Sequence, residues 1–191
     1  MTINTRIVLC SAALAALMLP ASAQINQRKE NQQDRIANGV ASGQLTAGEA
    51  ANLEKKESNL SKEEKLMRSE DGGKLTGADR KVLNQQQNSF SKQIYQDRHN
   101  AAVQNTNPRS EVGKRAENQQ DRIAQGLKSG QLTAGEASNL ERKEAGINRE
   151  VRNDRAANGG TLTRQERAQV NRQQNHVSNQ IYNKKHNGRV R

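Results

Sequence analysis

The sequence is poor in the residues that build deep cores. Its 191 residues include no Trp, one Phe and two Tyr. From Gln24 onward, Leu, Ile, Val and Phe make up roughly 15% of the chain, which keeps partial disorder open as an alternative to a packed fold. So little apolar material argues against an enzyme with a walled pocket. It is enough for thin helical bundles, because a helix needs only one narrow apolar stripe.

The one cysteine, Cys10, lies in a 13-residue apolar run, Ile7–Leu19, that follows a short basic start and is broken by Pro20. The run is too short to span a membrane, and the small residues before Gln24 are typical of a secretory cleavage site. We therefore predict a signal peptide at residues 1–23, cleaved after Ala23, and a periplasmic or secreted protein. A lipoprotein processing site at Cys10 is the alternative, but it would cut within the apolar run.

The chain after this segment contains no cysteine and no stretch long enough for a transmembrane helix. Disulfides, thiolate metal sites and a cysteine nucleophile are therefore excluded there. The sequence also lacks a Gly-x-Ser-x-Gly motif, a phosphate-binding glycine loop and a zinc-binding histidine pair. We predict a non-enzymatic protein with no catalytic residues, no cofactor and no metal site.

Two of the three histidines, His99 and His186, occur in the same motif, Ile-Tyr-x-x-x-His-Asn. Spacing by four places each histidine on one helical face with Tyr95 or Tyr182. We predict that the histidines cap the negative C-terminal ends of helices. A joint ligand-binding role for Tyr and His is the alternative.

The chain repeats itself. Glu30–Asn100 aligns with Glu117–Asn187 at a constant offset of 87 without gaps, and 40 of 71 positions are identical. We therefore divide the chain into unit 1 (residues 24–100), a linker (101–116), unit 2 (117–187) and a basic tail (188–191).

Four copies of the motif Gly-x-Leu-Thr-x-x-acid punctuate the repeats. The glycine ends one helix, and the threonine and the acid three residues later form a capping box that starts the next. These pairs are Thr46 with Glu49, Thr76 with Asp79, Thr133 with Glu136, and Thr163 with Glu166.

Apolar residues between the motifs recur at helical intervals, as in Leu53, Leu60 and Met67. We predict an all-α fold of two tandem three-helix units, built as antiparallel hairpins. The expected helices lie near residues 26–39, 46–69, 76–98, 113–126, 133–156 and 163–185. The middle helices are expected to be continuous, with a break near residues 58–59 or 145–146 as the alternative. The thin stripes also favour a homo-oligomer, with Leu53, Leu60 and Met67 as a helix–helix seam.

The repeated motif resembles the second half of an EF-hand calcium loop, with Glu49 in the last ligand position. The early ligand positions of that loop should be Asp or Asn. In the first loop they are Asn38, Val40 and Ser42, and two other loops begin with Arg. Capping is therefore the preferred interpretation, and a weak calcium site at Asn38, Ser42 and Glu49 is the alternative.

The motif is also similar to the turn of short bacterial helical-hairpin domains, and the two-unit chain resembles secreted bacterial tandem-repeat proteins. That resemblance implies a compartment and an architecture but no activity.

Charge is distributed unevenly. Residues 24–100 contain 13 basic and 11 acidic residues, whereas residues 101–191 contain 17 and 9. The acidic residues alternate with Lys and Arg, as in Glu54-Lys55-Lys56-Glu57, which predicts solvated, salt-bridged faces. The candidate anion-binding residues of unit 2 are Arg149, Arg152, Arg155, Arg164, Arg167, Arg172, Lys184 and Lys185.

A basic surface on an exported protein favours anionic lipid headgroups, polysaccharide or an acidic protein as the partner. The lack of stacking aromatics argues against nucleic acid. We therefore expect a structural or interaction role that uses unit 2. One alternative is a basic protein with no dedicated ligand. The other is a calcium-responsive protein of degenerate EF-hand type.

Overall fold

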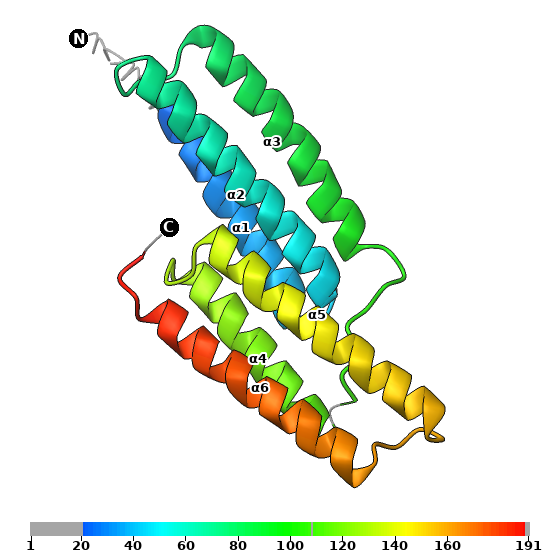
Figure 1. The fold of residues 1–191 in the computed structure, drawn as a ribbon. Helices are drawn as coiled ribbons and strands as arrows, with labels where there is room; N and C mark the ends of the chain where they lie inside the picture. Colours follow the sequence, from blue (N-terminus) through cyan, green and yellow to red (C-terminus); the bar gives the residue numbers. More distant parts are fainter. Residues whose placement is uncertain (1–20, 108, 190–191) are drawn as a thin grey trace, which may run out of the picture.

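The computed structural model describes residues 21–107 and 109–189, and this part of the chain is all-α, without strands (Figure 1). Its helices are α1 (Ala21–Ala41), α2 (Ala47–Glu70), α3 (Gly77–Arg98), α4 (Glu111–Lys128), α5 (Ala134–Ala157) and α6 (Arg164–Lys185). The predicted fold class is confirmed. The middle helices, α2 and α5, are continuous, so neither alternative break occurs.

Two helices extend further than the sequence pattern indicates. Helix α1 begins at Ala21, so the predicted cleavage after Ala23 falls in its first turn, whereas residues 1–20 lie outside the described residues. Helix α4 begins at Glu111, inside the segment assigned as linker. Ser110 caps it by accepting a hydrogen bond from the Gly113 backbone N–H at 3.0 Å.

The four repeated motifs all form capping boxes, which is why α2, α3, α5 and α6 begin one residue after a threonine. At α2 the Thr46 hydroxyl accepts from the Glu49 N–H at 3.3 Å, and Glu49 Oε2 accepts from the Thr46 N–H at 2.9 Å. Gly43, with φ 70°, provides the left-handed turn before this cap. Leu45, between them, is fully buried. The motif therefore ends one helix, starts the next and anchors the turn in the core.

The two units pack on each other through equivalent helices. Helix α2 lies antiparallel against α5, the most extensive contact between helices, and α1 lies against α4 (Figure 1). Helices α3 and α6 flank this central group on opposite sides. Because α1 and α2 each meet their own repeat counterpart, the arrangement is self-complementary, like the interface of a two-fold symmetric dimer.

A single apolar cluster runs through both units. It includes Leu53 and Ile94 of unit 1 together with Leu140 and Ile181 of unit 2. The units therefore share one core instead of forming two separate ones.

The apolar stripe of α2 is covered within the chain. Leu53 is fully buried in the shared core, Leu60 packs against it, and Met67 packs against a smaller cluster that contains Leu75. Leu53 is therefore not available as a seam between molecules, whereas Leu60 and Met67 are half-buried by packing within the chain.

Close approach of α2 and α5 depends on small residues. The Ser138 hydroxyl of α5 donates to the Ala51 carbonyl oxygen of α2 at 2.8 Å, and these two positions are equivalent in the repeat. Both residues are buried. The pseudo-symmetry axis therefore passes near this pair. No helix among the described residues is long and apolar enough to cross a membrane.

Substituting glycines tests this packing. At Gly126 of α4 an added Cβ would lie 2.6 Å from Leu132 Cδ1, whereas at Gly146 of α5 it would meet nothing within 4 Å. We expect Gly126→Ala to lower the free energy of unfolding by about 1–3 kcal/mol through overpacking. Gly146→Ala should raise it by about 1 kcal/mol through helix propensity. Urea denaturation of both variants measures this, and a shift of the same sign for both would contradict the packing described.

Candidate functional site

Four glutamates lie buried where α2 packs on α5. They are Glu54 and Glu57 of α2 and their repeat equivalents, Glu141 and Glu144 of α5, and each is at most 2% exposed. We refer to them as the glutamate cluster. The prediction of solvated, salt-bridged faces is therefore wrong at Glu54 and Glu57, because α5 and α1 cover this side of α2.

Glutamines of the neighbouring helices hydrogen-bond the cluster. Gln33 Nε2 of α1 donates to Glu54 Oε2 at 3.0 Å, and Gln120 Nε2 of α4 donates to Glu141 Oε2 at 2.9 Å. Both oxygens of Glu144 are buried without a hydrogen-bond partner among the described residues. Burial of a carboxylate with so few donors strongly favours its neutral form.

The acidity of the α5 glutamates follows from this environment. Burial raises the pKa of Glu144 to about 8. Burial also raises the pKa of Glu141 well above its ordinary value, against the lowering effect of the Gln120 hydrogen bond, and the charges of Glu144 and Glu54 add to the rise. Glu144 is therefore largely protonated at neutral pH, burial favours the neutral form of Glu141 as well, and unit 2 is more basic than its formal charge.

The sequence contained a signal for this cluster. Glu57 stands four residues after Leu53 and three before Leu60, and Glu144 holds the same place between Leu140 and Ile147. Both therefore lie on the apolar stripe of their helices. An acid on such a stripe in both repeats indicates a buried carboxyl rather than a solvated one.

Proton binding by the cluster links stability to pH. An ordinary Glu has a pKa of 4.5, so between pH 4.5 and 8 the folded chain holds a proton on Glu144 that the unfolded chain releases. The free energy of unfolding should therefore fall by up to about 1.4 kcal/mol per pH unit for each such group as the pH rises. The contribution is complete below pH 4.5 and lost above pH 8.

The variant Glu144→Gln tests this linkage, because Gln is neutral at every pH. Urea denaturation between pH 5 and 9 should show a smaller loss of stability with pH than in the parent chain. The exposed Glu70→Gln serves as the control and should leave the pH dependence unchanged. An unchanged slope for Glu144→Gln would contradict the buried, protonated state.

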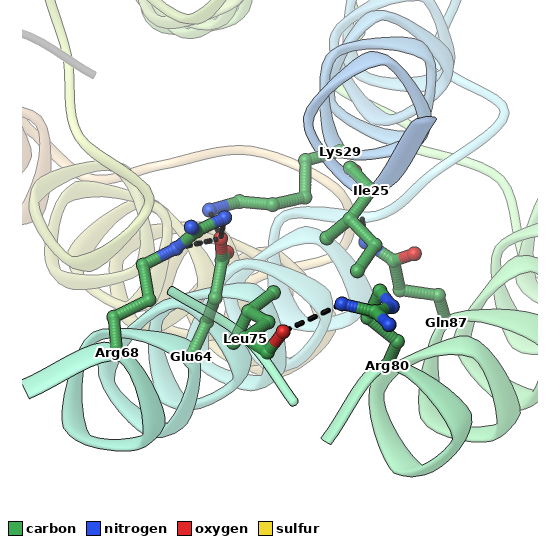
Figure 2. A network of polar contacts seen from close by, with 7 residues as sticks. All are labelled: Ile25, Lys29, Glu64, Arg68, Leu75, Arg80 and Gln87. Carbon is green, nitrogen blue, oxygen red and sulfur yellow. Dashed lines mark hydrogen bonds and ion pairs between the residues drawn. The ribbon is translucent and has the colours of Figure 1, made fainter. Parts of the chain in front are cut away.

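A fifth acid, Glu64 of α2, is buried but paired. Figure 2 shows Lys29 of α1 and Arg68 of α2 meeting its carboxylate, at 2.9 Å and 2.7 Å. Burial opposes ionisation of Glu64, but hydrogen bonds and charge from Lys29 and Arg68 prevail and lower its pKa. Unit 2 has Ala116 and Val151 in place of Lys29 and Glu64, and both are buried.

The second repeat therefore supplies a test of the first. Lys29→Ala alone should destabilise the fold by about 1–2 kcal/mol, because it removes one partner of a buried carboxylate. The double variant Lys29→Ala/Glu64→Val, which copies unit 2, should recover to within about 1 kcal/mol of the parent chain. Thermal unfolding of the parent, both single variants and the double variant measures the coupling, and additive losses would refute it.

A basic cleft of about 760 Å³ lies between the units. Its lining includes Lys29, Lys62 and Lys65 of unit 1, together with Lys184 at the end of α6 and Arg189 of the basic tail. The first turn of α5, from Ala134, forms part of its wall, and so does Glu57 of the glutamate cluster. We call it the inter-unit cleft. Of the eight candidate anion-binding residues only Lys184 lines the cleft, and Arg189 belongs to the predicted basic tail. The three lysines of unit 1 were not predicted, because the cleft exists only once the units pack.

The other predicted anion-binding residues occupy different places. Arg149, Arg152, Arg164, Arg167 and Arg172 are exposed.

Arg155 is half-buried and donates to Ser110 Oγ at 3.1 Å, and it lines a smaller groove together with Arg167. Lys185 lies against α4 near Gly126 and Arg122, and burial followed by the Arg122 charge lowers its pKa. The structure thus spreads the eight candidates over several surfaces instead of gathering them at one point.

The histidines take the predicted capping role. His99 and His186 are the C-cap residues of α3 and α6, and the ring Nδ1 of each lies 2.7 Å from the carbonyl oxygen of Tyr95 or Tyr182. Each ring also lies over the tyrosine ring. Both tyrosines are exposed, and this arrangement ends the helix without forming an enclosed site.

The carboxylate of the alternative calcium site is already engaged. Glu49 Oε2 accepts from Thr46, and Oε1 accepts from Asn100 Nδ2 at 2.6 Å. Asn38 and Ser42 are exposed, and the single Ser42 hydroxyl proton is shared between Gln44 Oε1 and the Gly39 carbonyl oxygen. Within residues 21–107 and 109–189, no three His, Cys, Asp or Glu side chains are grouped so as to hold a metal ion.

Comparisons of the chain with models of protein families, with curated proteins and with solved structures found no match. The chemistry of the glutamate cluster and of the basic surfaces therefore carries the functional argument alone.

Proposed function

We propose that the mature chain is an exported, non-enzymatic helical repeat protein that binds anionic envelope material through its basic second unit. The observation that supports this best is the set of exposed arginines on α5 and α6. Anionic lipid headgroups, polysaccharide and acidic proteins share the chemistry that such a surface attracts.

The position of these arginines suits contact with a large partner. The end of α5 and the start of α6 project beyond the helices of unit 1 (Figure 1). Arg152 and Arg164 stand on this projecting part. A planar or extended anion can therefore reach them without displacing unit 1.

The glutamate cluster strengthens the charge of this surface. Residues 101–191 carry a formal charge of +8, with 17 basic and 9 acidic residues. A proton held on the buried Glu144 would raise it to +9. The fold itself therefore adds to the basic character of this part of the chain.

Nucleic acid is a poorer candidate than envelope polymers. The chain has three aromatic residues in all, and stacking on aromatics provides much of the affinity for single strands. The predicted signal peptide also directs the chain out of the cytoplasm.

Charge reversal on α6 tests the proposal. Arg164→Glu/Arg172→Glu in the mature chain should weaken binding to phosphatidylglycerol vesicles or to polygalacturonate by about 10-fold or more at low salt. Lys81→Glu/Lys92→Glu on α3, the counterpart helix of unit 1, changes the net charge equally and should cost less than about 3-fold. Sedimentation with vesicles and affinity electrophoresis in the polymer, each over a salt series, measure both. Equal losses for the two variants, or salt-independent binding, would sink the proposal.

A further inference from the structure

The inter-unit cleft has a repeat-equivalent groove on the other side of the molecule, and the linker lies in that groove. The Gln104 backbone N–H donates to the Gly43 carbonyl at 3.0 Å, and Gln104 Oε1 accepts from the Ala47 N–H at 3.0 Å. Two residues on, Thr106 Oγ1 donates to Glu117 Oε1 at 2.8 Å. An extended peptide segment thus contacts both a helix N-terminus and the facing unit.

The inter-unit cleft presents the same groups. Gly130, Ala134 and Glu30 are the repeat equivalents of Gly43, Ala47 and Glu117. Among residues 21–107 and 109–189, no group accepts from the Ala134 N–H or donates to the Gly130 carbonyl as Gln104 does in the other groove. The residue equivalent to Gln104 is Arg191, which lies outside the described residues.

Charge distinguishes the two grooves. Lys29, Lys184 and Arg189 of the inter-unit cleft replace Ala116, Asp97 and Ala102 at the equivalent positions. The cleft therefore has five basic and three acidic lining residues, whereas the same positions of the filled groove have two basic and four acidic. The filled groove holds a neutral polar segment, and the cleft favours an acidic one.

We infer that the inter-unit cleft is a docking site for an extended acidic peptide segment of a partner protein. An Asp or Glu carboxylate would take the place of the Gln104 amide and accept from Ala134 at the N-terminus of α5. There the partial positive charge of the helix favours an anion. The next contacts are the lysines of α2, Lys62 and Lys65.

Backbone pairing favours a peptide over a sugar chain as the occupant. The linker uses its own N–H toward Gly43, so the equivalent Gly130 carbonyl offers an acceptor that a peptide backbone matches in register. The inference goes beyond the proposed function, because it assigns the cleft as a second recognition site with a partner class of its own. The arginines on α5 and α6 remain the proposed contact with envelope material.

A synthetic heptapeptide tests the inference on the full mature chain. The peptide has the sequence of residues 101–107 with Gln104→Glu, Asn105→Asp and Asn107→Asp, and the unsubstituted peptide is its neutral control. In a titration followed by amide NMR, the acidic peptide should shift the Ala134 and Gly135 signals, and those of Ala47 and Gly48 should stay in place. The neutral peptide should bind at least about 10-fold more weakly, because it lacks the charge attraction.

Two matched charge reversals locate the site. Lys62→Glu/Lys65→Glu in the cleft should weaken peptide binding at least about 10-fold, and Lys81→Glu/Lys92→Glu on α3, which lies outside the cleft and changes the net charge equally, by less than about 2-fold. Circular dichroism confirms that both variants are folded. Equal effects of the two variants, or a titration that leaves Ala134 unmoved, would overturn the inference.

The second part of the experiment repeats the amide NMR titration with polygalacturonate and with phosphatidylglycerol vesicles. If they bind through α6 while the peptide leaves Ala134 unmoved, the cleft inference fails and the proposed function stands. If either one shifts Ala134 with a higher affinity than the peptide, the partner class is wrong. If the peptide alone binds, the cleft inference is supported and the broader proposal of envelope binding fails.

Discussion

The antiparallel packing of α2 on α5 is the contact on which the rest of the structure depends. Small residues, Ala51 and Ser138, allow the helices to approach, and the hydroxyl of one helix is bonded to the backbone of the other. The same approach encloses Glu141 and Glu144 away from water. Because charged carboxylates are very costly in such surroundings, close packing of these helices favours the protonated form of both carboxyls. Association of the repeats is therefore coupled to protonation.

A self-complementary interface would by itself create two equivalent grooves between the units. The linker makes them different, because it fills only one of the two. Gln104 and Thr106 lie in one groove and join the start of α2 to Glu117 of unit 2. The other groove contains Lys184, where the filled one has Asp97. Near-identical helices thus produce one side that the chain covers itself and one side with the charge to attract a partner. Functional asymmetry comes from the connection and a few substitutions, and not from a different fold.

Local chemistry explains which parts of the structure could be predicted from the sequence. The helix starts at Ala47 and Ala134 could be predicted, because each capping box is complete within four residues of sequence. The exposure of Arg149 and Arg152 could also be predicted, because neither residue lies on the apolar stripe of α5. The burial of Glu54 could not be inferred in this way, because the helices that cover it, α1 and α5, lie elsewhere in the chain. The inter-unit cleft depends on the same long-range packing. Apolar residues that recur every three or four positions define the buried face of one helix, but they do not show which other helix will pack on that face.

Glu57 joins the two features that carry functional meaning, because it belongs to the glutamate cluster and also lines the inter-unit cleft. A rise in pH that ionises Glu144 would place negative charge in the core and weaken the packing of α2 on α5. The cleft is formed by that packing, since Lys62 stands on α2 and Ala134 begins α5. Loss of the Glu144 proton would therefore lower the positive potential around the inter-unit cleft and also loosen the packing that forms it. Both effects act in the same direction, so attraction for anions and stability of the fold should decline together as the solution becomes alkaline.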